Sequence, residues 1–269
     1  MKALKILYED KDILAIDKPS GIFVHADGKT KEKTVSDWFL KNYSKVKNVG
    51  ESIFVDGKEI KKPGIVHRLD KETSGVLLLA KNQKAFEFLK AQFKNREIKK
   101  VYNAIVSGWV KNDRGVVNKP IGRSPVDFRR RLAGRGARGE LREAITEYKV
   151  LKRFIVPASS KFLSLRPQAG PSGSKILKMP ARFTFLEIKP KTGRTHQIRV
   201  HMKFLNHPVV CDSLYNPKGF CPKELNRLAL HARFIEFNLP AQTGDLKSKV
   251  LKIESKLPKE IEKMVNPHT

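Results

Sequence analysis

The sequence has few features that would crosslink the chain or anchor it in a membrane. Only two cysteines occur among 269 residues, Cys211 and Cys221, which excludes a disulfide-dense secreted scaffold. We expect both to be free thiols, because a single pair in a basic cytosolic chain is more often reduced than bridged. No apolar run approaches the roughly 18 residues of a spanning helix, and residues 1–8 lack the apolar centre of a secretion signal. The sequence therefore predicts a cytoplasmic protein that does not enter a membrane.

Acidic residues are also scarce. There are 27 Asp and Glu against 55 Lys and Arg, which gives a formal net charge of +28. Such a chain repels itself unless it normally meets a polyanion, and nucleic acid is a better candidate than an anionic membrane. The length and the 40% hydrophobic content allow a substantial core, as one large domain or as two packed lobes. Disorder of the whole chain is excluded on the same grounds.

Potential soft metal ligands are concentrated in the last third of the chain, so a zinc site has to be weighed. Six of them are His196, His201, His207, Cys211, Cys221 and His231. His196 and His201 are five residues apart, which places them about 140° apart on a helix and on opposite faces of a strand. No CxxC or HxxxH spacing occurs. We therefore expect no metal site.

The pattern of apolar residues predicts strands and helices without regular alternation, and no repeat or linker divides the chain. Thr34 and Asp37 form a capping box before a helix, and Asn82 can cap a second helix that carries Phe86, Leu89 and Phe93. Further helices are expected from Thr195 and from Pro258. Strands are expected at residues 12–18, 76–80, 101–107, 146–151, 162–166 and 183–188. These elements predict a single α+β domain over residues 1–269.

Two stretches do not fit this pattern and are expected to be surface loops inserted into the domain. Residues 123–143 contain seven Arg, three acids and three Gly, and residues 169–180 are rich in Gly, Ser and Pro. An excess of Arg over Lys favours forked phosphate contacts or stacking, so the first loop is expected to contact RNA. The alternative is a charged loop that is merely solvated.

The most specific feature is the segment Gly64 to Asp70 (GIVHRLD), which precedes the apolar run at residues 76–80. A carboxylate there would lie in a turn that opens onto a buried strand, although an Asp beside Arg and Lys is usually a local ion pair. A second segment, residues 189–199 (KPKTGRTHQIR), places Arg194 where a helix begins. Such a helix start could bind a phosphate, or could hold Arg194 against a buried carboxylate.

Together these motifs resemble the RluA-type pseudouridine synthase family. The resemblance covers nearly the whole chain, in order: residues 17–21 (DKPSG), 67–70 (HRLD), 99–102 (KKVY), 192–199 (TGRTHQIR), 207–208 (HP) and 228–232 (LALHA). It implies a mixed, mainly antiparallel curved sheet in two halves with flanking helices. The motifs begin within about twenty residues of Met1, so we expect no S4-type RNA-binding module.

The resemblance also implies roles for individual residues. Asp70 matches the catalytic aspartate, Tyr102 the active-site tyrosine and Arg194 the basic partner of the aspartate. Arg68 matches a residue that occupies the space left by the everted nucleotide, with His67 beside it also expected at the substrate, and Ile198 matches an apolar wall position. Taken alone, Tyr102 would be read as an ordinary strand tyrosine. The remaining expected RNA contacts are Arg129, Arg130 and Arg131.

The implied reaction converts uridine in structured RNA to pseudouridine by exchanging the bond from C1′ to N1 for one from C1′ to C5. Asp70 would either attack C1′ or remove a proton from C2′, and no cofactor is implied. Ribosomal RNA is the favoured substrate, with transfer RNA possible, and a monomer is the default. Two alternatives stay open: a non-catalytic RNA-binding or ribosome-assembly factor, and a metal-dependent hydrolase that uses the C-terminal His and Cys residues.

Overall fold

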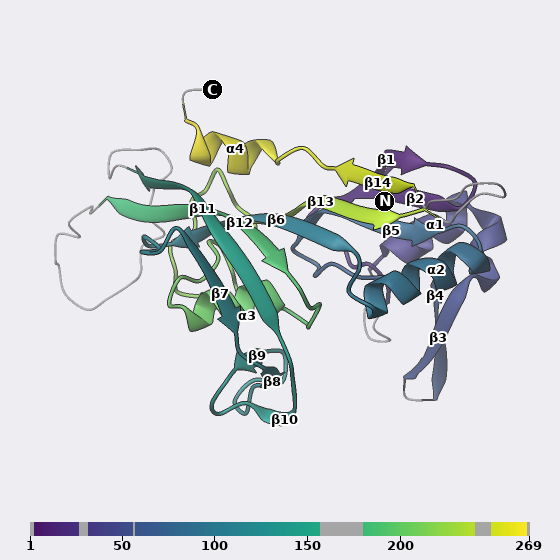
Figure 1. Ribbon diagram of the computed structural model, residues 1–269, viewed down its shortest axis with the longest axis horizontal. Helices are drawn as coiled ribbons and strands as arrows, with labels where there is room; N and C mark the ends of the chain where they lie inside the picture. Colours follow the sequence, from purple (N-terminus) through teal and green to yellow (C-terminus); the bar gives the residue numbers. More distant parts are fainter. Residues whose placement is uncertain (1–2, 27–31, 56, 157–179, 240–248, 268–269) are drawn as a thin grey trace. The chain divides into compact units, whose positions relative to one another are not determined.

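The computed structural model describes residues 3–26, 32–55, 57–156, 180–239 and 249–267. The chain divides into two compact units. Unit 1 comprises Met1–Tyr102 and His231–Lys256, and unit 2 comprises Asn103–Leu230 and Leu257–Thr269. Each unit combines a mainly antiparallel sheet with helices, as Figure 1 shows, so the predicted α+β class is confirmed. Among these residues, no helix is both long and apolar enough to cross a membrane.

The sheet of unit 1 is built around a fully buried strand. Its strands lie in the order β1 (Lys5–Glu9), β2 (Ile13–Lys18), β5 (Ser74–Ala80) and β13 (Leu230–Asn238), and β14 (Val250–Glu254) pairs with β13. β2 is antiparallel to both β1 and β5, whereas β5 and β13 are parallel. All seven residues of β5 are buried. This agrees with the prediction of a buried central strand, because a strand covered on both faces reads as a continuous apolar run.

The helices of unit 1 begin at the predicted caps. In α1 (Val35–Asn42), the Thr34 hydroxyl accepts the Asp37 amide, and the Asp37 carboxylate accepts the Thr34 amide. In α2 (Gln83–Lys94), the Asn82 side chain accepts the Ala85 amide at 2.9 Å. Both capping predictions are therefore confirmed. Between the helices lie a short 3₁₀ helix, η1 (Ser44–Asn48), and a hairpin of β3 (Gly50–Val55) and β4 (Lys58–Pro63) that the sequence pattern did not predict.

The sheet of unit 2 contains β6 (Lys99–Ser107), whose residues from Asn103 onward belong to this unit, followed by β12 (Ala181–Pro190), β11 (Ile145–Val156) and β7 (Arg114–Asn118). Its helices are α3 (Gln197–Phe204) and α4 (Lys259–Val265). α3 begins two residues later than expected, because His196 has a left-handed φ of 56° and ends a turn there. Pro258 is the N-cap residue of α4, so the helix itself begins one residue later, at Lys259. The strand predicted at 162–166 lies outside the described residues.

Residues 123–143 were expected to form a basic surface loop, and the expectation of a loop is wrong. β8 (Ile121–Arg123) pairs with β9 (Arg131–Ala133) and β10 (Arg138–Arg142) in a small antiparallel sheet, which we call the Arg-rich sheet and which Figure 1 shows at one end of unit 2. Its glycines explain the difference. Gly134 and Gly136 adopt positive φ, 72° and 84°, which permits the tight turn between β9 and β10, and Gly139, with φ 73°, lies where the register of β10 is irregular. The segment does lie at the surface, since every residue of β10 is exposed. Of the second expected loop, only residue 180 is described.

The two cysteines form a disulfide, so the expectation of free thiols is also wrong. Local turns bring Cys211 and Cys221 together, with their Cα atoms 4.7 Å apart. Cys211 has a left-handed φ of 58°, and the amides of Asn216 and Gly219 close two successive turns on the carbonyls of Asp212 and Asn216. A separation of ten residues in the sequence does not reveal this folded path.

Candidate functional site

Asp70 lies in a turn immediately before β5. Its carbonyl accepts the Thr73 amide at 3.1 Å, and its side chain is half-buried. The completely buried β5 that follows fixes one end of this turn, because a strand covered on both faces cannot shift without exposing apolar surface. The turn therefore holds the Asp70 carboxylate at the edge of the core, where it is partly screened from water.

Lys18 holds the Asp70 turn from the other side. Its side chain is 0% exposed, and its ammonium donates to the carbonyls of Pro19, Ile22 and Lys71 at 2.7 to 3.0 Å. The Ser20 hydroxyl donates to the Glu72 carbonyl at 2.6 Å. A buried cation is tolerated when several polar groups solvate it, and here the solvating groups include the backbone directly after Asp70. The DKPSG motif thus fixes the turn that carries the carboxylate.

Tyr102, at the start of β6, lies near Asp70. It is half-buried against the core of unit 1. Burial raises the pKa of the Tyr102 phenol above its ordinary value, and the negative charge of Asp70 raises it further. The phenol is therefore protonated at neutral pH. It offers a ring face and a hydroxyl rather than a phenolate.

His67 is engaged by the protein itself. The Leu78 amide donates to its Nε2 atom at 2.9 Å, and its ring stacks on Phe93 with centroids 4.6 Å apart. Burial, with a smaller contribution from the positive charge of Lys100, lowers the pKa of His67 to about 3. The imidazole is thus neutral at neutral pH, and its contacts hold the segment before Asp70 in place. Arg68, the next residue, is exposed.

The turn that carries Arg194, in unit 2, is organised by one buried glutamine. Gln197 accepts hydrogen bonds from the Thr192 hydroxyl at 2.7 Å and from the Arg194 amide at 3.0 Å. Its Nε2 donates to the Ile145 carbonyl and the Thr146 hydroxyl. The Arg194 guanidinium donates from Nε to the Glu143 carbonyl at 2.9 Å. Since the Arg194 and Gln197 amides are both bonded within the turn, this helix start offers fewer free amides for a phosphate than expected.

α3 is held by polar contacts that the sequence did not reveal. The Arg199 guanidinium forms a buried two-pronged ion pair with Asp212, at 2.7 and 2.8 Å. The Tyr215 hydroxyl lies 2.9 Å from His196 Nδ1 and also accepts the Arg131 amide at 2.9 Å. Ile198, the predicted wall residue, is only 6% exposed. The Arg-rich sheet, Tyr215 and the Arg194 turn are therefore joined by hydrogen bonds.

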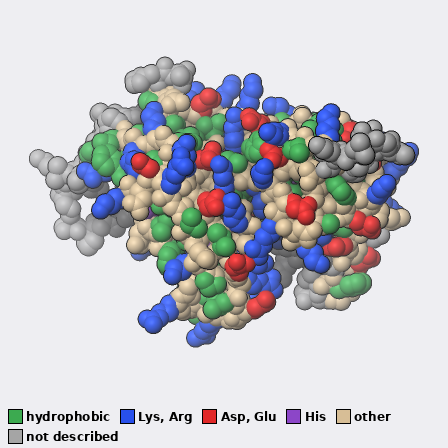
Figure 2. Space-filling model, in the orientation of Figure 1, with side chains coloured by type: hydrophobic (Ala, Val, Ile, Leu, Met, Phe, Trp, Pro, Cys, Tyr) green, Lys and Arg blue, Asp and Glu red, His purple; other side chains and the backbone are tan. Residues whose placement is uncertain are grey.

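Of the three consecutive arginines, Arg129 is exposed and Arg130 and Arg131 are half-buried. Arg129 donates from Nε and Nη2 to the Asp127 carboxylate at 3.0 and 2.8 Å, and Arg130 Nε lies 3.4 Å from the same group. Asp127 therefore offsets part of their charge. Across the visible face, Figure 2 shows Lys and Arg spread widely between fewer acidic side chains.

Among the described residues, three histidines of the last third each have a partner of their own. His201 lies between Thr146 and the Lys119 carbonyl, His207 contacts the Ser107 carbonyl, and His231 contacts Ser74. Within the described ranges, no group of three or more His, Cys, Asp or Glu side chains is placed to hold a metal ion.

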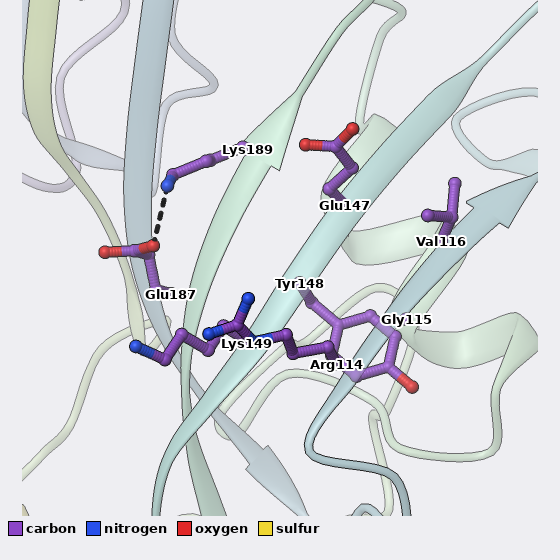
Figure 3. Close-up of a pocket in the computed structure, with 8 residues that line it drawn as sticks. All are labelled: Arg114, Gly115, Val116, Glu147, Tyr148, Lys149, Glu187 and Lys189. Carbon is purple, nitrogen blue, oxygen red and sulfur yellow. Dashed lines mark ion pairs between the residues drawn. The ribbon is translucent and has the colours of Figure 1, made fainter.

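A hollow of about 450 Å³ lies on the exposed face of β7, β11 and β12. Figure 3 shows its lining, where Tyr148 lies beside Gly115 and Lys189 pairs with Glu187 at 3.0 Å. None of the residues predicted as a site lines it. The ring of Tyr148 covers Gly115 so closely that a Cβ there would meet its hydroxyl at 2.5 Å. We read this hollow as the sheet surface around a packed tyrosine.

The structure thus places His67, Arg68, Asp70 and Tyr102 in unit 1, and Ile198, Arg194 and the three arginines in unit 2. Sequence reasoning missed Lys18, Gln197, Asp212 and Tyr215, which position these groups. Lys18 and Gln197 lie inside the recognised motifs, and this position was the only sequence signal that could have pointed to them. Asp212 and Tyr215 lie outside the motifs.

An α+β fold with mainly antiparallel sheets that carries these motifs in this order is the architecture of a pseudouridine synthase. A solved human structure, RNA Pseudouridylate Synthase Domain Containing 4, matches with a TM-score of 0.62 and 26% identity over 96% of this chain and 90% of that one. Residues 12–204 match the model of the RNA pseudouridylate synthase family. The chain belongs to this family, and its RluA-type resemblance is confirmed.

Two bacterial relatives show the extent of the similarity. An uncharacterized RNA pseudouridine synthase of Aquifex aeolicus is 38% identical over 82% of this chain and 59% of its own length. The ribosomal large subunit pseudouridine synthase D of Pseudomonas aeruginosa is 34% identical over 96% of this chain and 69% of its own. The chain thus spans between about three fifths and seven tenths of the length of these relatives.

Proposed function

We propose that this protein isomerises specific uridines in structured RNA to pseudouridine, with large-subunit ribosomal RNA as the favoured substrate. The observation that carries the proposal is the pairing of a half-buried Asp70, held in a fixed turn, with a Tyr102 close enough to respond to its charge. The name of the Pseudomonas relative supports the choice of ribosomal RNA over transfer RNA.

In the proposed reaction, the bond from ribose C1′ to uracil N1 breaks, the uracil turns, and a bond from C1′ to C5 forms. N1 gains a proton and C5 loses one, so atoms and charge balance without a redox or group-transfer partner. The Asp70 carboxylate attacks C1′ or takes a C2′ proton, and both routes need it ionised. Arg194 is proposed, on the family resemblance, as the basic partner of this aspartate.

The proposed role of Tyr102 does not include that of a general base in the phenolate form. Because its pKa is raised, a phenolate is disfavoured at neutral pH, and the ring is available to stack on the extruded uracil. Its hydroxyl can pass the C5 proton only by giving up its own proton in the same step. Arg68 is proposed to fill the space left by the nucleotide, with Ile198 as a wall and Arg129 to Arg131 as RNA contacts.

Tritium release tests the function. Purified protein is incubated with an unmodified large-subunit ribosomal RNA transcript and with a transfer RNA transcript, both labelled with tritium at uracil C5. We expect release from the ribosomal transcript, because C5 loses its hydrogen when the new bond forms. RNA binding without release from either transcript would contradict the proposal and would support a non-catalytic RNA-binding factor instead.

A further inference from the structure

The turn that joins β8 to β9 presents two apolar side chains to solvent. In this turn, residues 124–130, which we call the tip, Val126 is 92% exposed and Phe128 is 86% exposed. Isolated exposed apolar residues are common on proteins. Here, however, two of them stand two positions apart on one turn of a small sheet, and arginines flank them on both sides in the sequence.

The tip is ordered by its own hydrogen bonds. The Ser124 amide donates to the Arg130 carbonyl at 3.1 Å, and the Arg130 amide donates to the Asp127 carbonyl at 2.9 Å. The Ser124 hydroxyl accepts from the Val126 amide at 3.3 Å. Phe128 is therefore held outward by a folded turn. Its exposure does not come from an unstructured chain.

Asp127 fixes the centre of the tip and keeps it fixed over a wide pH range. Its carboxylate accepts the Arg129 amide and two guanidinium hydrogen bonds from Arg129. These contacts lower the pKa of Asp127 to about 2. The carboxylate is thus charged at any pH near neutrality, and the arrangement that presents Phe128 does not change there.

The Arg-rich sheet contacts the turn that carries Arg194 at both of its ends, since Arg131 directly follows the tip and Glu143 follows β10 at the opposite end. On one side, the Arg131 amide donates to the Tyr215 hydroxyl, which contacts His196. On the other side, the Glu143 carbonyl accepts from Arg194 Nε. Within unit 2, the tip that carries Phe128 is therefore directly followed in the chain by Arg131, which is joined through Tyr215 to the turn of Arg194.

The chemistry of the tip suits RNA better than a protein partner. An exposed aromatic ring can stack on any base, and neighbouring arginines attract the phosphates on either side. Apolar side chains flanked by cations also act as wedges between base steps. A surface that binds another protein usually exposes a larger apolar patch than two side chains.

We propose that the tip is a base-stacking element, in which Phe128, supported by Val126, packs against an unpaired base of the RNA substrate. The proposal rests on the proposed function, because it takes RNA as the substrate. It assigns to Phe128 an RNA contact that does not depend on charge.

The test compares Phe128→Ala and Phe128→Trp with the wild-type protein. Filter binding to the unmodified large-subunit ribosomal RNA transcript gives the dissociation constant, and tritium release gives KM and kcat. Loss of one stacked base is expected to raise the dissociation constant and KM of Phe128→Ala about tenfold, with kcat within about twofold. Phe128→Trp is expected to retain wild-type affinity. The midpoint of thermal unfolding is expected not to move in either variant, since Phe128 is not packed.

Val116→Ala is the matched control, because Val116 is a 63% exposed apolar residue of β7, outside the Arg-rich sheet. Its RNA affinity is expected to equal that of the wild type. Unchanged affinity of Phe128→Ala would overturn the inference, whatever else the tip binds, and so would an equal loss in Val116→Ala. A wild-type protein that does not bind the transcript would also overturn it. Binding without tritium release would contradict only the proposed function, since the affinity comparison stands alone.

Discussion

At the scale of single residues, the site depends on side chains that are unusual for their type. Lys18 has no exposed surface, although lysine is among the residues least often buried. His67 is neutral and holds a backbone amide, although histidine in a site is usually read as a catalytic group. Both act on the segment that carries Asp70. The fully buried Lys18 and the half-buried His67 therefore hold the backbone on either side of Asp70.

Replacing Lys18 tests this fixation. Lys18→Met keeps the length of the side chain but leaves three carbonyls without their donor, so it is expected to lower the free energy of unfolding by about 2 to 4 kcal/mol. Urea unfolding at neutral pH measures the difference. The control is Lys11→Met, at an exposed position of the same segment, which is expected to change stability by less than about 0.5 kcal/mol. Equal stability of the two variants would contradict the role of Lys18.

The lowered pKa of His67 predicts how the free energy of unfolding changes with pH, and in which direction. Its folded pKa, about 3, is below the value near 6.5 of an unfolded chain. Below pH 6.5 the unfolded state binds more protons, so stability from this group is complete above that pH and falls as pH decreases towards 3. His67→Gln cannot titrate. Between pH 7 and pH 5 the wild type is expected to lose up to about 2 kcal/mol more than this variant in urea unfolding. An identical loss in both would contradict the assignment.

At the scale of elements, the successful predictions rest on local rules, although not every local signal was recognised. The cap residues Thr34 and Asn82 and the buried run in β5 could be predicted because each signal involves neighbouring residues. The β3–β4 hairpin was missed although Asp56-Gly57 is a turn signal in the sequence. The disulfide and the Arg199–Asp212 ion pair depend on turns whose path only the folded chain reveals.

The capping box of α1 provides a prediction at this scale. Thr34→Ala removes the acceptor for the Asp37 amide and is expected to lower the free energy of unfolding by about 1 kcal/mol. Thr34→Ser keeps the hydroxyl and is expected to lose less. Thermal and urea unfolding of the two variants measure the difference. If Thr34→Ser were as destabilised as Thr34→Ala, the lost methyl packing of this buried residue, and not the cap, would be responsible.

At the scale of the whole molecule, the formal charge of +28 follows directly from the sequence and belongs to no single contact. For the proposed RNA substrate, this charge predicts strongly electrostatic binding. The sequence could also supply the order of the family motifs. It could not supply the way in which Gln197 and Tyr215 connect the Arg194 turn to the rest of unit 2, because these contacts join residues far apart in the chain.

Salt dependence tests the electrostatic part. If six or more phosphates are neutralised, the logarithm of the association constant is expected to fall with the logarithm of salt concentration with a slope of about −4 or steeper. Filter binding of the ribosomal RNA transcript at several salt concentrations gives the slope. Phe128→Ala is expected to keep the wild-type slope, since it removes no charge. A slope near zero would contradict RNA binding through the basic surface.

The central claim is that the Asp70 carboxylate carries the chemistry, and single-turnover tritium release with Asp70→Asn tests it most directly. The variant keeps the shape of the side chain and removes its charge, so turnover is expected to fall at least about a thousandfold while RNA affinity stays within about threefold. Glu72→Gln, which neutralises another carboxylate of the same turn, is expected to keep wild-type turnover. Unimpaired turnover in Asp70→Asn would contradict the mechanism.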